Sequence, residues 1–434
     1  MSSINSNNTV KKPSDWPNYG AETTPYISAE QSLIPEEKGS NWNAFVHLIC
    51  ATAGSGILGV PHALSQGGWS LLAILTLSAV MSVYSNNKLI ESLYHDGKTR
   101  KLSMPQLAFD AFGKSGLLVI GFFYNSVSFG TVVLFLILAG QNLHGLLQNS
   151  VDLRMEDWVY ICAAVMGVPF VLSKTIKEAV WLSLFGALTT SLVAVVVSYS
   201  SVVDYPNHPN SSHDIINFRK IPIALGTLNF AYGGNVIFPN IEAGMKTPSA
   251  WPKVNCLAIS LLTSMYFLIG IPAYLTYGDQ TSSPVYLSLP AGWAVTISIT
   301  MITAHVLLAL PIYMISVCLN IEEHLGITVA KVGRLREYLY RILLRTSLMT
   351  IVVCFAVFAP YFADVMALLG ALGNGVLLVV MPVVIWIKLF GWDRLHGVGE
   401  KLWVVFILIY AVLGSAIGTS DAMMALWNDI DKKD

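Results

Sequence analysis

Charged residues are scarce in this sequence, where Asp, Glu, Lys and Arg together make up only 12% of 434 residues. A soluble domain carries roughly 25% charged residues. Hydrophobic residues reach 54% and the mean hydropathy is +0.60. This composition predicts a polytopic membrane protein. The net charge of −1 argues against the strongly basic surface that binds nucleic acid, so no nucleic-acid partner is expected.

Cysteine is also rare, and its arrangement does not indicate a metal or disulfide site. The five cysteines lie in or beside apolar segments without CxxC spacing, at Cys50, Cys162, Cys256, Cys318 and Cys354. The sequence also lacks GxSxG, HExxH and Walker motifs, and it has no pair of carboxylates within a span. We therefore expect no enzyme activity, no cofactor and no bound metal.

Apolar runs long enough to cross a bilayer recur about eleven times. The sequence therefore predicts an all-α membrane protein with about eleven transmembrane helices. Residues 1–41 are polar and predict a disordered tail, and residues 426–434 predict a second, short tail. The apolar runs lie near residues 43–66, 69–94, 117–147, 157–173, 176–203, 220–243, 254–277, 291–320, 341–359, 364–388 and 401–425.

The basic residues predict the orientation of these helices. If the amino terminus is cytosolic, the cytosolic loops collect most of the Lys and Arg residues, including those in 98–101 and 331–345. Loops on the cytosolic side of membrane proteins carry such an excess. We therefore expect residues 1–41 in the cytosol. An odd number of helices then places residues 426–434 on the opposite side.

The first apolar segment is interrupted where a spanning helix should be continuous. It contains Gly54, Gly56 and Gly59, followed by Pro61. Glycine lets the backbone leave helical angles, and proline removes a hydrogen-bond donor. In lipid, such a break is tolerated only where the freed backbone groups meet protein, water or a ligand.

A second interruption follows about 180 residues later, where Gly233 and Gly234 precede Pro239. Two broken helices at corresponding positions of two halves are typical of secondary transporters, which bind substrate at the breaks. The alternative is that the glycines only let helices pack closely. The sequence favours a site, because two matched segments are each followed by proline.

The broken helices suit a zwitterion. A half-helix that starts near Gly59 and Pro61 would present N–H groups and a positive dipole to a carboxylate. Carbonyls freed around residues 232–235 would face an ammonium group. We therefore predict that an amino acid binds here. The predicted binding residues are Thr52, Ala53, Gly54, Ser55, Gly56, Ile57 and Leu58 from the first break, and Tyr232, Gly233, Gly234, Asn235 and Phe238 from the second.

Ionisable residues within spans are functional candidates. Glu242 follows the second break and either carries a coupling proton or is a helix-end carboxylate near the cytosolic interface. His305 is either a second proton carrier or an ordinary core histidine. Thr303, Tyr124 and Asn374 are predicted to line the path, with simple packing as the alternative. The expected coupling ion is H⁺, and hydroxyl groups in the eighth segment keep Na⁺ open.

With these motifs, the chain resembles the amino acid/auxin permease superfamily, and within it the branch of the vesicular inhibitory amino acid transporter and its vacuolar relatives. The similarity covers roughly residues 43–425. It is carried by GSGILGVPHALSQGGW at 54–69, IESLYHDGKTRK at 90–101, GGNVIFPNIEAGMKTPSAW at 233–251 and APYFADVMALLGALGNG at 359–375.

The resemblance implies a LeuT-like fold, with ten core helices in two inverted five-helix repeats, helices one and six broken, and an eleventh helix added. The transporter domain would cover 42–425, with repeat one at about 43–203, repeat two at about 220–388 and the extra helix at about 401–425. The resemblance also implies alternating access and proton-driven exchange of small neutral amino acids such as GABA or glycine across a vesicle membrane.

Two alternatives stay open. The first is a proton- or sodium-coupled amino acid symporter of the plasma membrane, vacuole or lysosome. The second is a sensor that has a transporter fold, binds an amino acid and signals through its tail. Substrate counterflow separates transport from sensing, because a sensor binds but does not exchange. The expected partners are a small amino acid and the lipid bilayer. The sequence does not indicate the oligomeric state.

Overall fold

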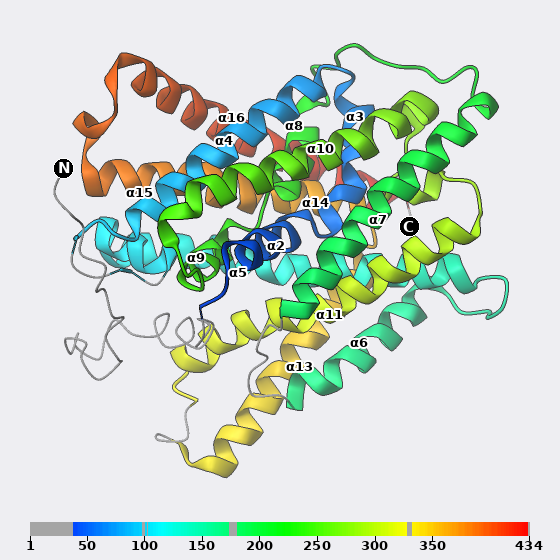
Figure 1. Cartoon of the computed structure of the whole chain (residues 1–434). Coiled ribbons are helices and arrows are strands. Elements are labelled where there is room, and N and C mark those ends of the chain that lie inside the picture. Colours follow the sequence, from blue (N-terminus) through cyan, green and yellow to red (C-terminus); the bar gives the residue numbers. More distant parts are fainter. Residues whose placement is uncertain (1–37, 98–99, 102, 173–179, 328–331, 433–434) are drawn as a thin grey trace.

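The computed structural model describes residues 38–97, 100–101, 103–172, 180–327 and 332–432, and these residues form a bundle of long helices (Figure 1). Apart from one isolated β-bridge, the regular structure of these ranges is helical. Most of the tail predicted for residues 1–41 lies outside the described residues. Its last part is ordered, because Gly39 pairs with Met245.

The helices occupy the apolar runs expected from the sequence. In chain order they are α2 (Asn41–Ala53), α3 (Val60–Gly67), α4 (Leu71–Ser92), α5 (Met104–Leu147), α6 (Met155–Leu172), α7 (Val180–Asp204), α8 (Ile221–Ala231), α9 (Phe238–Ala243), α10 (Trp251–Tyr277), α11 (Trp293–His324), α13 (Arg334–Phe358), α14 (Phe362–Leu369), α15 (Met381–Phe390) and α16 (Gly397–Asp431).

Many of these helices can cross a membrane. Within the described ranges, eight segments are long and apolar enough to span a bilayer, or nine if the bent pair Asn41–Ala53 and Ser55–Gly67 forms one span. The predicted segments 69–94 and 157–173 are not among these, but both are helical, as α4 and α6. The protein is therefore an all-helical polytopic membrane protein.

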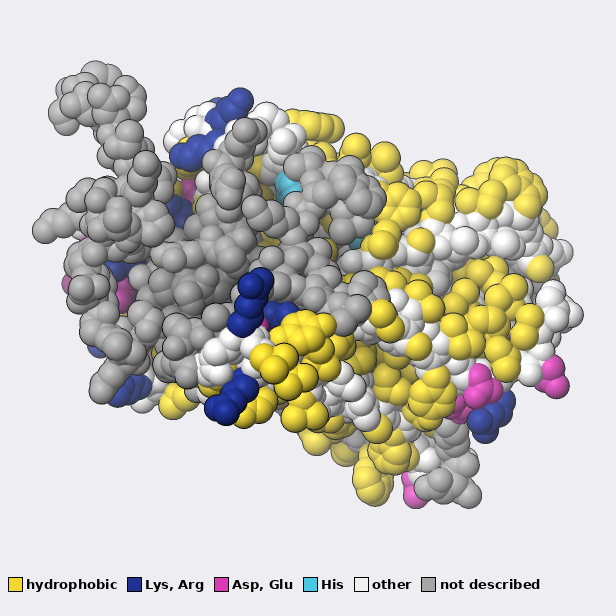
Figure 2. Space-filling view, turned by 90° about the horizontal axis from the view of Figure 1, so that it is seen from below, with side chains coloured by type: hydrophobic (Ala, Val, Ile, Leu, Met, Phe, Trp, Pro, Cys, Tyr) yellow, Lys and Arg dark blue, Asp and Glu magenta, His cyan; other side chains and the backbone are white. Residues whose placement is uncertain are grey.

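The described surface is divided by polarity. Figure 2 shows most of the visible Lys and Arg side chains toward the left end of the molecule, whereas hydrophobic side chains cover much of the described surface to their right. Among the described residues, large apolar side chains are exposed, such as Leu188 at 59% and Leu413 at 54%. Exposed residues of this kind are stable in contact with lipid rather than water.

Helix α5 has two parts. Gly113 has φ 64° and ψ −150°, so it separates a short first part from the long second part. A positive φ favours glycine, because side chains clash there. Ser103 caps the first part by accepting a hydrogen bond from the Gln106 amide at 3.5 Å. The first part therefore turns away from the long apolar part that follows.

The segment from α14 to α15 is wound more loosely than an α-helix. Residues Gly370–Asn374 and Val376–Val380 have π-helical hydrogen bonding. This segment approaches α8 backbone to backbone, since a Cβ atom on Gly370 would lie only 1.7 Å from the Gly226 carbonyl oxygen. Glycines at both positions permit the contact. π-helical turns are frequent at functional sites.

Helix α16 extends to Asp431 and so includes most of the short carboxyl-terminal tail predicted for residues 426–434. The Tyr361 hydroxyl donates a hydrogen bond to the Asp429 carbonyl oxygen at 2.6 Å. Helix α14 also packs along α16. This tertiary contact stabilises a polar last turn that the hydropathy of the sequence does not reveal.

Candidate functional site

The first break lies at Gly54. Helix α2 ends at Ala53, a 3₁₀ turn runs from Ser55 to Gly59, and α3 follows from Val60. The axes of the two halves differ by 43°. The bend therefore lies at Gly54, and the α-helical part of the second half begins at Val60, which agrees with the predicted start near Gly59 and Pro61. Pro61 lies in the first turn of α3. It is accommodated because the N–H groups of the first turn have no acceptor within the helix, so the missing N–H of proline costs no hydrogen bond.

The second break lies between Ala231 and Asn235. Helix α8 ends at Ala231, and a 3₁₀ turn from Asn235 to Ile237 leads into α9. Gly234 has φ +116°, which a residue with a side chain rarely adopts. The glycine is therefore required by the backbone path itself.

The two breaks lie directly against each other. A Cβ atom on Gly56 would come within 2.7 Å of the Ala231 Cα atom, and a Cβ atom on Gly234 within 2.8 Å of the Ala51 carbonyl oxygen. These two glycines serve close packing. Gly54 differs, because a Cβ atom there would meet nothing within 4 Å. The space beside the first break is thus open on the side of Gly54.

Three polar side-chain atoms at the breaks are buried without a hydrogen-bond partner among the described residues. Among the described residues, no hydrogen bond reaches the Thr52 and Ser55 hydroxyls or the Asn235 side-chain oxygen. Thr52 and Ser55 flank Gly54, and all three residues are 4% exposed or less. Buried polar atoms in native proteins are nearly always hydrogen-bonded, and an unsatisfied one costs free energy. Such a cluster indicates a binding site for a polar ligand.

Two of the predicted binding residues face other partners. The Tyr232 hydroxyl bonds to Thr263 Oγ1 at 2.9 Å and donates to the Leu75 carbonyl oxygen at 3.3 Å. The Phe238 ring packs against Trp251 with centroids 5.7 Å apart. Both side chains thus make tertiary contacts beside the second break, and their role in binding stays a prediction.

The carbonyl groups of the second break are only partly available. Tyr266 donates its hydroxyl hydrogen to the Ala231 carbonyl oxygen at 2.5 Å. The side-chain amide of Asn235 donates to the Leu377 carbonyl oxygen in the π-helical segment, also at 2.5 Å. Asn374 of the same segment lies against Gly233, since a Cβ atom there would be 2.5 Å from its Nδ2 atom. The π-helical segment therefore borders the second break.

The remaining first-break residues Ala53, Ile57 and Leu58 are fully buried in the apolar core. Of the predicted path-lining residues, Tyr124 is 8% exposed in α5. The Thr303 hydroxyl accepts from the Asn142 amide at 2.7 Å and donates to the Ile299 carbonyl oxygen at 2.7 Å. The hydrogen bonds of this hydroxyl are therefore made within the protein.

His305 is buried in α11, and its Nδ1 atom has no hydrogen-bond partner among the described residues. It lies beside Cys50 of α2. A Cβ atom on Gly186 of α7 would come within 2.8 Å of His305 Nδ1 and within 2.6 Å of Cys50 Sγ. The histidine thus stands where three helices meet, one of which is the first half of the broken helix.

Glu242 lies near the carboxyl end of α9 and is fully buried. The Arg100 guanidinium contacts Glu242 Oε2 at 2.7 Å, and the Tyr94 hydroxyl donates to Oε1 at 2.5 Å. Our sequence reasoning missed both partners. A signal was present, because both residues belong to the 90–101 stretch that carries the family resemblance.

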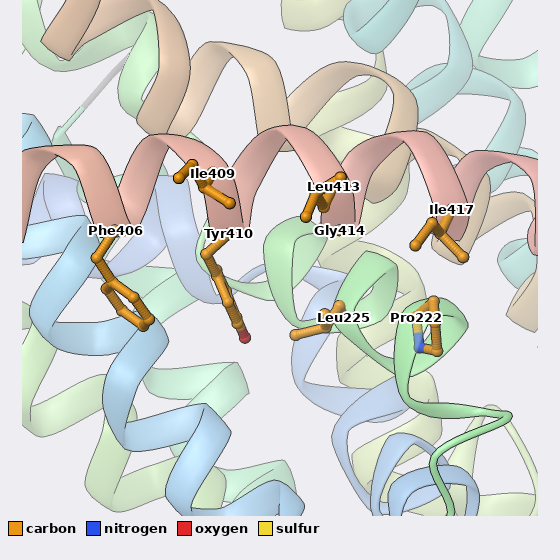
Figure 3. Close-up of a pocket in the computed structure, with 8 residues that line it drawn as sticks. All are labelled: Pro222, Leu225, Phe406, Ile409, Tyr410, Leu413, Gly414 and Ile417. Carbon is orange, nitrogen blue, oxygen red and sulfur yellow. The ribbon is translucent and has the colours of Figure 1, made fainter.

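An apolar hollow of about 320 Å³ lies elsewhere, between α16 and α8 (Figure 3). Its lining presents almost no polar surface, so it does not suit a zwitterion. The breaks, with their unpartnered polar atoms, suit one better. The residues that line the hollow are Pro222, Leu225, Phe406, Ile409, Tyr410, Leu413, Gly414 and Ile417.

Solved structures identify the fold. The chain aligns with MhsT in complex with L-phenylalanine at a TM-score of 0.54, with 12% identity over 89% of this chain and 100% of that chain. It aligns with a Na⁺-coupled sialic acid symporter at a TM-score of 0.57, with 12% identity over 92% of this chain and 94% of that chain. The protein therefore has the LeuT-type fold of multispanning transporters.

Sequence comparison identifies the family. The profile described as "Transmembrane amino acid transporter protein" matches residues 37–424, and the chain belongs to that family. Amino acid transporter AVT1I of Arabidopsis thaliana is 27% identical over 86% of this chain and 92% of its own length. The vesicular inhibitory amino acid transporter of Xenopus tropicalis is 25% identical over 92% of this chain and 79% of its own length. The protein is a non-enzymatic amino acid transporter.

Proposed function

We propose that this protein is a proton-coupled exchanger of small neutral amino acids, with GABA and glycine as substrates. The amino acid binds at the two breaks, and alternating access exposes the site to either side of the membrane. The compartment is a vesicle or vacuole, and the amino terminus faces the cytosol. The eleven helical segments all span the membrane, as two inverted five-helix repeats followed by α16.

The observation that carries this proposal is the cluster of unpartnered polar atoms at the breaks. The half-helix that starts at Ser55 directs its first N–H groups and positive dipole end toward the space beside Gly54. A carboxylate is the natural ligand for such an end. The Thr52 and Ser55 hydroxyls can donate to the same carboxylate. The Asn235 side-chain oxygen can accept a hydrogen bond from the ammonium group.

The substrate must be small, because the surroundings of the break are tightly packed. Among the described residues, Gly56 and Gly234 both contact the opposite break, whereas Gly54 has open space beside it. A side chain as large as that of phenylalanine has little room there. Glycine and the unbranched GABA molecule fit these limits, and the vesicular relative is named for inhibitory amino acids.

Uptake into proteoliposomes tests the proposal. The panel contains GABA, glycine, alanine, glutamine and a basic amino acid, each measured with and without Na⁺ under an imposed pH gradient. We expect an acidic interior to drive GABA or glycine inward without Na⁺. A requirement for Na⁺ or for an acidic exterior would instead show a symporter. Binding without uptake or counterflow would show a sensor.

His305 is the proposed carrier of the coupling proton, because it is buried beside α2 and its Nδ1 atom has no partner. We expect His305→Gln to abolish the stimulation of uptake by the pH gradient while counterflow at equal pH persists. The control is His144→Gln, which removes a partly exposed histidine whose Nδ1 atom lies 3.1 Å from the Leu153 carbonyl oxygen. Full gradient-driven uptake by His305→Gln would exclude this role.

A further inference from the structure

Arg100 and Glu242 join two parts of the chain that lie 142 residues apart. Both Nε and one terminal nitrogen of Arg100 are 2.7 Å from Glu242 Oε2. The same guanidinium donates to the Pro239 carbonyl oxygen in the first turn of α9. The Glu242 side chain is 0% exposed and that of Arg100 is 19% exposed. Arg100 therefore bonds to α9 at both a side chain and the main chain.

The residues near Arg100 make further polar contacts. The loop that carries it is closed by a hydrogen bond from the Lys101 amide to the Leu93 carbonyl oxygen at 2.8 Å. The Lys101 ammonium contacts the Asp110 carboxylate in the first part of α5 at 3.1 Å. His95 lies 3.7 Å from the same carboxylate. The end of α4 and the start of α5 thus fix the loop from both sides.

The residues that follow the carboxyl end of α9 are hydrogen-bonded to the chain that enters α2. The Gly39 amide donates to the Gly244 carbonyl oxygen at 2.7 Å, and the Lys246 amide donates to the Gly39 carbonyl oxygen at 2.9 Å. Helix α2 begins two residues after Gly39. The halves of the broken helices on this side, α2 and α9, are therefore joined by main-chain hydrogen bonds and also contact each other.

We infer that Arg100 is a positioning residue that holds α9, and α2 with it, closed over the cytosolic end of the site. This inference rests on the proposed transport function. A buried carboxylate is stable only while it is paired. When Arg100 releases Glu242, the carboxylate must reach water, and α9 and α2 must move outward for it to do so. The ion pair thus sets the balance between a closed and an open cytosolic side.

Alkylation of Cys50 reports this movement without any need for transport. Cys50 is partly buried in α2, whereas Cys162 and Cys318 are buried in other helices. We expect Arg100→Gln and Glu242→Gln to increase the rate at which N-ethylmaleimide labels Cys50 in nanodiscs by about tenfold or more. Mass spectrometry of the labelled peptides separates Cys50 from the two buried cysteines, whose rates should stay unchanged.

Matched variants identify the role of the ion pair. Arg154→Gln removes an arginine just before α6 whose side chain is 78% exposed and pairs with Asp157 in the first turn of that helix. The rate of Cys50 labelling in this variant should equal that of the wild type. The exchanged pair Arg100→Glu with Glu242→Arg should restore slow labelling and recover uptake. Wild-type labelling in both single variants would overturn the inference. Faster labelling of all three cysteines, or no recovery in the exchanged pair, would also overturn it, because either result indicates general loosening.

The two proposals can fail separately. If the wild-type protein neither accumulates nor exchanges an amino acid, the proposed function is wrong, whatever Cys50 shows. If the wild-type protein transports and the single variants transport at the same rate with unchanged Cys50 labelling, only the role of Arg100 is wrong.

Discussion

Replacing Gly54 by leucine is expected to reduce amino acid uptake to background while the protein stays folded. A side chain at this position meets nothing within 4 Å, so the leucine has room, although the φ of 19° and ψ of −139° at Gly54 will cost the variant about 1–3 kcal/mol of stability. It would, however, fill the space in which the substrate carboxylate is proposed to lie. A loss of binding free energy of about 3 kcal/mol lowers affinity by more than about a hundredfold. Radiolabelled uptake and the thermal unfolding midpoint of the purified variant check both parts of this expectation.

Two other glycines provide controls for Gly54→Leu. Gly145 in α5 also has nothing within 4 Å of an added Cβ atom but lies away from the breaks, so Gly145→Leu should transport normally. Gly56→Leu should instead destabilise the fold by about 1–3 kcal/mol, because an added Cβ atom comes within 2.7 Å of the Ala231 backbone. Normal uptake by Gly54→Leu would refute the proposed site.

Removing the unpartnered hydroxyls should weaken binding without destabilising the empty protein. In Thr52→Val and Ser55→Ala, each variant loses a hydroxyl that has no hydrogen-bond partner in the described structure. A hydrogen bond to a charged group contributes about 1.5–3 kcal/mol, so each variant should raise Kd by about tenfold to a hundredfold. The thermal midpoint without ligand should be unchanged or higher, since an unsatisfied buried group has been removed. Thermal unfolding with and without glycine measures both effects.

Thr131→Val is the matched control for Thr52→Val. The Thr131 hydroxyl is equally buried but donates to the Val127 carbonyl oxygen in its own helix at 2.8 Å. Its loss should lower stability by about 1 kcal/mol and leave Kd unchanged. If Thr52→Val behaved like Thr131→Val, the Thr52 hydroxyl would have no part in binding.

Much of the helical framework follows from hydropathy alone. The predicted segment 254–277 corresponds to α10 at Trp251–Tyr277, and the segment 220–243 contains both halves of the second broken helix. The positions of the two breaks also follow from glycine and proline, because these residues act on the local backbone. A single sequence therefore predicts best those features that depend on the residues of one segment, such as apolar helices and helix breaks.

The parts that the sequence did not reveal depend on contacts between distant residues. The sequence offered Gly54, Gly56, Gly59 and Pro61 for the break, and only the folded chain shows that the bend lies at Gly54. The hydrogen bond between Tyr232 and Thr263 was likewise not visible in the sequence. Glu242 suggested a proton carrier or a helix end, and its pairing with Arg100 becomes visible only in the folded chain.

The central claim is that the two breaks bind both charges of a small amino acid. The most direct test is calorimetric binding of glycine, glycine methyl ester, methylamine and acetate to the purified wild-type protein and to Gly54→Leu. We expect glycine to bind the wild-type protein, the three analogues that lack one charge to bind at least about tenfold more weakly, and Gly54→Leu to bind none of them. Equal affinity for glycine and its methyl ester, or unchanged binding of glycine to Gly54→Leu, would contradict the claim.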